Sequence, residues 1–302
     1  MKTLKPHLLV APTLAALLAA CGGGGGNAGG PPPVVASSSA SAVMYSQSLL
    51  VTLNGSNLDQ GLSVTSSGCR DMARSSTAPY ISSASVAYYQ CLASAVGAQQ
   101  VNVARAGDGV ALASVPFSVA VPQVTVSVSN GAAVNGNFVI TLSPQQAPLT
   151  VNNFLAYVKS GFYVGTVFHR HAPGFVLQGG GYAGPIGPAG PLPILKPNPS
   201  AAIVLEDGAG LSNLRFTVGM ERLNEPDTAT SEFFVNLVDN PGRDRTATTR
   251  GYAVFGSISA GTDFVATMQG APCSFWPIFF GQNSTDCIPL PNLSIASAVQ
   301  TR

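Results

Sequence analysis

Apolar and polar residues alternate in short segments over the first part of the chain, and this period of two is typical of strands with one buried face. Turn-forming residues such as Asn54-Gly55 separate the segments. The expected strands between residues 44 and 121 are 49–53, 85–91, 100–104 and 115–121. Strands at this spacing predict a small β-sandwich over 44–121.

The same alternation resumes after Pro122 in a longer series of segments. The expected strands are 124–128, 137–142, 175–178, 216–220, 232–238, 252–258 and 293–298. Many strands with few helices predict an α+β, mainly β domain over 123–302, built on a closed antiparallel barrel.

Two segments show a helical rather than an alternating pattern. In the first, Val151, Phe154, Leu155 and Val158 fall at positions i, i+3, i+4 and i+7. Thr150 is the expected N-cap of this helix, and Gly161 ends it. A second, shorter helix is expected over 263–268 with Thr262 as its N-cap.

The N-terminus has the pattern of an export signal. Lys2 and Lys5 precede an apolar run, 14–20, that is too short for a stable membrane span. The segment Leu18-Ala19-Ala20-Cys21 resembles the lipobox of bacterial lipoproteins, which implies that 1–20 is removed and that Cys21 is lipidated. The alternative is an ordinary signal peptide in which Cys21 is incidental.

The residues after Cys21 favour the lipoprotein. Glycine, proline and serine dominate 21–43, and such a composition is typical of a flexible tether. Multiple acyl chains would anchor the chain stably to a membrane. Because Gly22 rather than Asp follows Cys21, we expect a location in the bacterial cell envelope, on the outer membrane facing the periplasm.

Composition narrows the class of protein further. Charged residues are 9% of the 302-residue chain and the formal net charge is +1, which excludes a basic nucleic-acid binder. Five cysteines less the lipidated Cys21 leave four, in two local pairs without Cys-x-x-Cys spacing. In an oxidising compartment we expect the disulfides Cys69–Cys91 and Cys273–Cys287.

A family resemblance covers about 123–302. Phe168-His169-Arg170 and the segment 173–181, which reads Pro-Gly-Phe-Val-Leu-Gln-Gly-Gly-Gly, are similar to the signature of cyclophilin-type peptidyl-prolyl isomerases. Further similar blocks follow in the family's order: 147–148, 151–154, 161–163, 219–220, 229–234 and 251–256. The resemblance implies an eight-stranded barrel with a helix at each end and a groove that binds X-Pro peptides in proline-containing clients.

The resemblance also implies roles for individual residues. Arg170 would donate to the prolyl nitrogen as the amide twists, and Gln178 would position both Arg170 and the substrate carbonyl. Phe175, Val176 and Phe234 would form an apolar socket for the proline ring. Glu232 and Tyr252 are the remaining expected substrate contacts.

Some positions depart from the family. Val176 replaces the usual Met, and Glu232 replaces the usual Gln, so that its carboxylate is expected to pair with Arg170. The segment Pro241-Gly242-Arg243-Asp244 stands where relatives place a hydrophobic rim, which this chain is expected to lack. The alternative to an isomerase is therefore a weakly active or inactive X-Pro peptide-binding or chaperone module.

Other sites are not expected. The segment 179–184 matches a dinucleotide-binding glycine pattern, but four prolines follow it, so no helix N-terminus would receive a phosphate. His169 and His171 have no third ligand at recognisable spacing, so we expect neither a metal nor another cofactor. His169 is interpreted as structural and His171 as solvent-facing. The start of the first domain, 49–58, resembles the TIG-type immunoglobulin-like modules, and the whole chain is expected to be monomeric.

Overall fold

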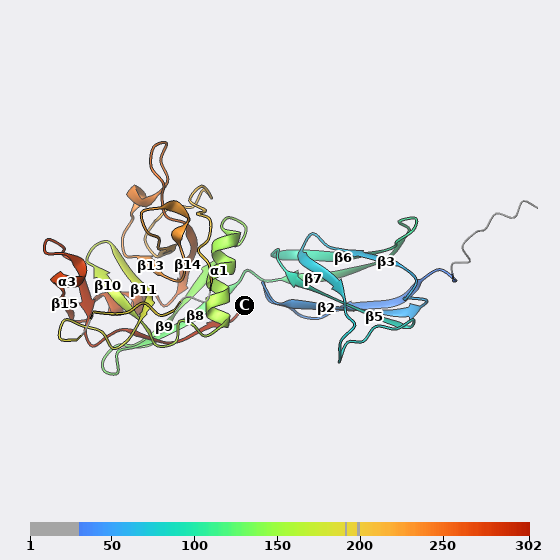
Figure 1. Cartoon of the computed structure of the whole chain (residues 1–302), viewed down its shortest axis with the longest axis horizontal. Helices are drawn as coiled ribbons and strands as arrows, with labels where there is room; N and C mark the ends of the chain where they lie inside the picture. The colour runs from blue at the N-terminus through green and yellow to red at the C-terminus, as the bar shows by residue number, and fades with distance from the viewer. Residues whose placement is uncertain (1–29, 191, 198–199) are drawn as a thin grey trace, which may run out of the picture.

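The structure is a computed structural model that describes residues 30–190, 192–197 and 200–302. Two β-rich units lie end to end, and the C-terminus of the chain lies close to the junction between them (Figure 1). The signal peptide and Cys21 lie outside the described residues, so both remain predictions. Among the helices of the described ranges, none combines the length and the apolar character needed to cross a bilayer.

The N-terminal unit consists of two antiparallel sheets. The first sheet has the strand order β1-β2-β5-β4, and the second has the order β3-β6-β7. The bounds are β1 Val34–Ala40, β2 Ser48–Ser56, β3 Leu62–Thr65, β4 Cys69–Arg74, β5 Val86–Ala93, β6 Gly97–Arg105 and β7 Ala111–Val119. Alternate residues of the strands are buried, such as Leu49, Val51 and Leu53 of β2. This alternation is the sequence pattern that predicted strands here.

The structure differs from the sequence expectations at the start of this unit. Residues 34–40, expected within the tether, form the edge strand β1 and pair with β2. Their Ser-rich sequence carries little alternation, because an edge strand is held mainly by backbone hydrogen bonds.

The predicted disulfide Cys69–Cys91 is present and joins β4 to its neighbour β5, with the Cα atoms 5.6 Å apart. The TIG-like relationship stays a prediction.

The C-terminal unit is the predicted closed barrel. Eight strands follow the order β11-β13-β12-β14-β9-β8-β17-β10, and the pairing of β10 with β11 closes the ring. All these pairings are antiparallel. The bounds are β8 Gln123–Ser129, β9 Asn135–Leu142, β10 Thr166–Ala172, β11 Val176–Ala183, β12 Thr217–Met220, β13 Phe233–Asn236, β14 Val254–Ala260 and β17 Ser294–Gln300.

Helix α1, Pro148–Lys159, packs its apolar face on the barrel core. Its Phe154 is fully buried and its ring centroid lies 5.0 Å from that of Phe255. The prediction of Thr150 as N-cap is wrong, since the helix begins at Pro148. N–H groups of the first turn have no acceptor within a helix, and here the Glu206 carboxylate accepts hydrogen bonds from the N–H groups of Leu149 and Thr150.

The remaining helical elements are short. Helix α2, Thr262–Gln269, has Gly261 rather than the predicted Thr262 as its N-cap, with φ at 82°. Helix α3 is Pro277–Phe280, and two 3-10 turns are η1, Pro226–Thr228, and η2, Pro241–Arg243.

Strand β10 carries Phe168-His169-Arg170, and the alternation did not predict it. Six of its seven residues are buried, so the sequence shows no polar side to the strand. β10 pairs with β17 at Val167 and, nearer its end, with β16, Cys287–Pro289, at His171. Strand β16 forms a hairpin with β15, Cys273–Phe275. The predicted disulfide Cys273–Cys287 closes this hairpin, with the Cα atoms 5.6 Å apart.

Candidate active site

The strand register brings Arg170 and Gln178 together. They stand opposite each other on the antiparallel strands β10 and β11, so their side chains lie on one face. The guanidinium Nη1 of Arg170 donates to Oε1 of Gln178 at 2.9 Å. Gln178 is therefore in a position to orient the guanidinium, and its contact with the substrate carbonyl stays a prediction.

An apolar socket lies beside the guanidinium. Val176, Phe234 and Ala172 are buried together, and the partly buried Phe175 and Tyr252 pack against them. Phe234 and Tyr252 meet edge to face with ring centroids 5.7 Å apart. The pocket has a volume of about 120 Å³, and its lining consists of Arg170, Phe175, Val176, Glu221, Phe234, Arg243 and Tyr252. Drug-sized sites are several times larger, so this socket suits a single small ring.

The rim of the socket is cationic. The Arg243 guanidinium lies 4.7 Å from the ring centroid of Phe175 and 5.9 Å from that of Tyr252. The Arg222 guanidinium lies 4.7 Å from the Tyr252 centroid. Arg243 comes from the 3-10 turn η2, in the segment expected to lack the hydrophobic rim. The guanidinium of Arg243, stacked on these rings, therefore occupies the rim position at which relatives have a hydrophobic side chain.

Glu232 does not pair with Arg170, and that prediction is wrong. Its Oε2 accepts a hydrogen bond of 2.9 Å from Nε2 of Gln178, which separates the carboxylate from the guanidinium. Burial raises the pKa of Glu232 to about 7, against the opposing effect of the Gln178 hydrogen bond. Glu232 lines a neighbouring pocket rather than the proline socket.

The two histidines of β10 are both buried. Burial lowers the pKa of His169 to about 3, so its imidazole is neutral, and its Nε2 lies 3.4 Å from Oε2 of Glu232. The prediction that His171 faces solvent is wrong, because β16 pairs with β10 at this residue and covers it. Burial also lowers the pKa of His171.

The ionic partner of Arg170 is Asp286, which the sequence analysis missed. Arg170 Nε donates to Asp286 Oδ2 at 2.6 Å. Asp286 is 116 residues away in sequence and directly precedes Cys287. The only sequence signal was the expected disulfide, which implied a local loop but not its register against β10.

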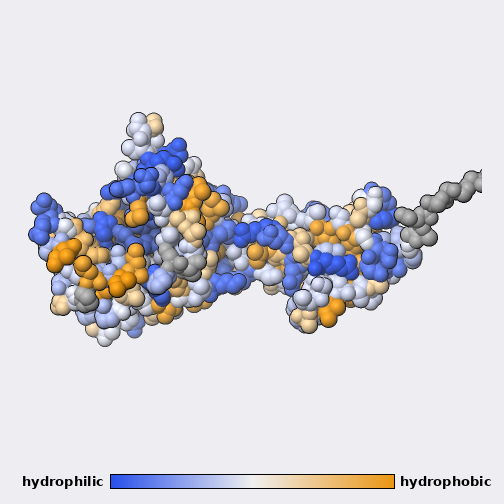
Figure 2. Space-filling model, in the orientation of Figure 1, coloured by the Kyte–Doolittle hydropathy of each residue, from blue (hydrophilic) through white to orange (hydrophobic). Residues whose placement is uncertain are grey.

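A larger pocket adjoins the socket. It has a volume of about 650 Å³ and shares Arg170 and Glu221 with the socket. Its other lining residues are His169, Gln178, Tyr182, Leu195, Lys196, Pro197, Arg222, Leu223, Thr228, Thr230, Ser231, Glu232, Phe279 and Phe280. Apolar surface gathers near α3 in Figure 2, where Ile278 is exposed.

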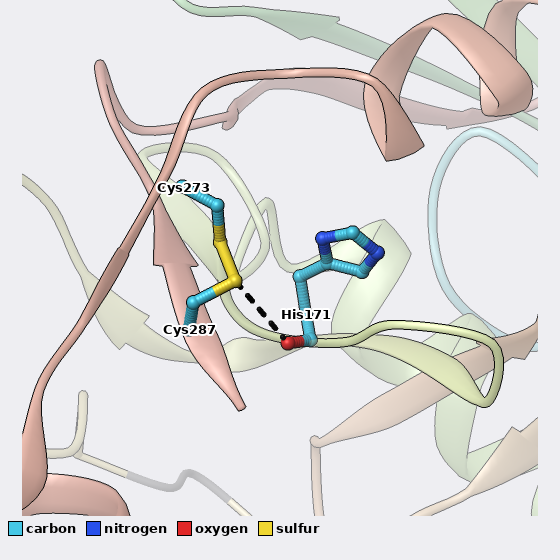
Figure 3. Close-up of side chains that lie close together, drawn as sticks. All are labelled: His171, Cys273 and Cys287. Atoms are coloured by element: carbon cyan, nitrogen blue, oxygen red, sulfur yellow. Dashed lines mark hydrogen bonds between the residues drawn. A yellow bond between two sulfur atoms is a disulfide. The ribbon is translucent and has the colours of Figure 1, made fainter. Parts of the chain in front are cut away.

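One grouping has atoms of metal-ligand type: His171, Cys273 and Cys287 lie within 4.8 Å of one another (Figure 3). The two sulfur atoms are bonded to each other, and only a thiolate is a good metal ligand. Cys287 Sγ lies 3.6 Å from the backbone oxygen of His171. The grouping is therefore a disulfide packed on β10.

Comparison with known proteins decides the family. The sequence model described as "cyclophilin type peptidyl-prolyl cis-trans isomerase/CLD" matches residues 124–298, more than half of the chain. The chain belongs to this family. Peptidyl-prolyl cis-trans isomerase A of Dickeya dadantii is 44% identical over 128 residues, which are 42% of this chain and 63% of that protein.

Two further proteins are similar to this chain. A peptidyl-prolyl cis-trans isomerase of Acinetobacter baylyi is 40% identical over 140 residues, 46% of this chain and 70% of that protein. The solved structure of a cyclophilin type isomerase of Cryptosporidium parvum is 22% identical in sequence, with a TM-score of 0.45. The superposition covers 60% of this chain and 98% of the chain of that structure. In the barrel of this chain, Arg170 and Gln178 are hydrogen-bonded to each other, and Arg170 lines one pocket with the apolar residues Phe175, Val176, Phe234 and Tyr252.

The raised pKa of Glu232 predicts a pH-dependent stability. Between its ordinary pKa of 4.5 and the folded value of about 7, the folded cyclophilin domain keeps a proton that the unfolded chain has lost. Stability from this group is therefore present at low pH and lost as pH rises through about 7. The Glu232→Gln variant should become more stable than wild type by roughly 2 kcal/mol between pH 5 and 8.

Urea unfolding followed by the fluorescence of Trp276, the one tryptophan, measures this difference. The buried histidines are common to both proteins, so their contributions cancel. Glu225→Gln, a change at an exposed glutamate, should keep the wild-type pH profile. A stability difference between Glu232→Gln and wild type that does not change with pH would contradict the assignment.

Proposed function

We propose that this chain is a lipid-anchored isomerase that accelerates rotation about X-Pro bonds in proteins of the bacterial cell envelope. The observation that carries the proposal is the placement of a guanidinium, Arg170, at the mouth of a small apolar socket. The family membership supports the reaction, and the envelope location rests on the N-terminal sequence alone. We propose a monomer whose partners are proline-containing polypeptides.

The reaction requires no covalent chemistry from the protein. Rotation about the amide meets a barrier of about 18–20 kcal/mol because conjugation keeps the bond planar. A twisted amide has a more basic prolyl nitrogen, which accepts a hydrogen bond that the planar form cannot. Arg170 offers permanently charged donors in a fixed planar fork for this nitrogen. A contact made only in the twisted state lowers the barrier.

The socket and the neighbouring polar groups hold the substrate while the bond turns. Phe175, Val176 and Phe234 would bury the pyrrolidine ring, and Gln178 would hold the adjoining carbonyl. The walls are strand residues of β11 and β13 or lie next to them, so they are fixed by the barrel. Rotation then occurs around a ring that stays in place.

A second function has two observations in its favour. Asp286 and Gln178 each accept one donor of Arg170, and the rim carries Arg243 instead of a hydrophobic residue. A guanidinium engaged in this way can still bind an X-Pro peptide in its ground state. The alternative is therefore a binding or chaperone module with little turnover.

Arg170→Ala distinguishes the two functions. Loss of a charged hydrogen bond of about 1.5–3 kcal/mol should lower kcat/KM roughly ten- to 150-fold. Arg170→Lys should restore little, because an ammonium group lacks the planar fork. Exchange NMR on an Ala-Pro peptide, without a coupled protease, measures turnover and affinity in one sample.

Arg105→Ala is the matched control, since this arginine pairs with Asp108 on the surface of the N-terminal unit. It should leave both quantities unchanged. Turnover in Arg170→Ala within about twofold of wild type, well below the expected loss, would refute the mechanism. Negligible wild-type turnover, with Arg170→Ala changing affinity alone, would support the binding module.

The lipid anchor is tested at Cys21. Cys21→Ser removes the thiol that would be acylated, so the variant should leave the membrane fraction or accumulate as an unprocessed precursor. Labelled palmitate followed after fractionation measures both effects. Incorporation equal to wild type in Cys21→Ser would contradict the anchor, and Cys69→Ser is a control that should keep the label.

A further inference from the structure

The hairpin β15–β16 lies outside the ring of eight barrel strands and attaches to it through β10. Cys287 of β16 pairs with His171, the residue that follows Arg170. Within the hairpin, Phe275 stands opposite Cys287 and Cys273 stands opposite Pro289. The disulfide between Cys273 and Cys287 ties the two strands together across the segment that contains α3. The hairpin is thus fixed at its base beside the active site.

Asp286 occupies the position directly before this fixed base. Its carboxylate accepts the 2.6 Å hydrogen bond from Nε of Arg170, and its own backbone N–H donates to Oγ of Ser284 at 3.0 Å. The side chain of Asp286 is 17% exposed and that of Arg170 is 27% exposed. A charged pair in such a partly buried place is screened less by solvent than a surface pair.

Two contacts on different atoms define the plane of the guanidinium. Asp286 holds Nε and Gln178 holds Nη1, while Nη2 has no hydrogen-bond partner among the described residues. An arginine side chain has many rotamers, and a single contact leaves much of this freedom. With both contacts the remaining donors of Arg170 have a fixed direction at the socket, which is the condition for stabilising a transition state without reorganisation.

We propose that Asp286 is a positioning residue for Arg170 and that the Cys273–Cys287 disulfide holds it in place. Loss of this disulfide then lowers isomerase turnover although neither cysteine lines the socket. The inference rests on the proposed isomerase function. It assigns a role to the hairpin that the barrel itself does not require.

The test compares kcat and KM for one Ala-Pro peptide across a set of variants. Asp286→Ala should lower kcat about tenfold, because a misdirected donor loses transition-state contact, while KM stays within about twofold. Asp286→Glu should recover part of kcat, since it restores a carboxylate. The double variant Cys273→Ser/Cys287→Ser should lower kcat in the same way, and adding Asp286→Ala to it should cause little further loss.

The other disulfide supplies a matched control. Cys69→Ser/Cys91→Ser removes a bond in the N-terminal unit and should leave kcat unchanged. Amide NMR spectra of the barrel residues establish that each variant is folded. The Nε–Hε signal of Arg170, which reports the contact with Asp286, should move in Asp286→Ala and in the Cys273→Ser/Cys287→Ser variant.

Two kinetic results would overturn the proposal. One is a kcat of Asp286→Ala that stays within about twofold of wild type or exceeds it. The other is a loss of kcat in Cys69→Ser/Cys91→Ser as large as that in Cys273→Ser/Cys287→Ser. Wild type without turnover would contradict the proposed function instead. In that case the Arg170 Nε–Hε signal still decides the positioning claim, because a signal unchanged in Asp286→Ala would refute it.

Discussion

Strand β10 pairs with three neighbours, and these pairings fix where the Arg170 guanidinium lies. β11 places Gln178 opposite Arg170, β17 continues the barrel, and β16 brings the hairpin with Asp286 alongside. A shift of one residue in any of these registers would turn the side chains of that strand to the opposite face. The closed barrel opposes such a shift for β11 and β17, since it leaves none of its eight strands unpaired.

From Arg170 a continuous series of polar contacts crosses the groove. Asp286 contacts Arg170, Arg170 contacts Gln178, and Gln178 contacts Glu232, which lies against the neutral His169. Members of such a network influence one another, so a change of protonation at Glu232 is transmitted to Gln178. Arg170 lines both the apolar socket and the larger pocket, whereas Gln178, Glu232 and His169 line the larger pocket alone. A substrate would therefore meet a rigid ring-binding wall and a polar line whose charge depends on pH.

Much of this arrangement was predictable from the sequence, and the failures have physical causes. The motif around Arg170 and Phe175 indicated the family, and cysteine spacing indicated both disulfides. The alternation of apolar and polar residues did not predict β10, because almost all of its residues are buried. His171, Glu232 and Asp286 were misjudged or missed because their partners depend on strand register and on a contact 116 residues away in the chain. Local patterns carry no information on such pairings. Arg243 was seen only as the loss of a hydrophobic residue, whereas it stacks on the rings of the socket.

The central claim is that the proline ring enters the socket beside a guanidinium directed at its nitrogen. A crystal structure of the whole chain with an Ala-Pro peptide tests it most directly. The account predicts the pyrrolidine ring among Phe175, Val176 and Phe234, with Arg170 the charged group nearest the prolyl nitrogen and still paired with Asp286. A proline ring seated in the larger pocket, or an Arg170 turned away from the peptide, would contradict the account.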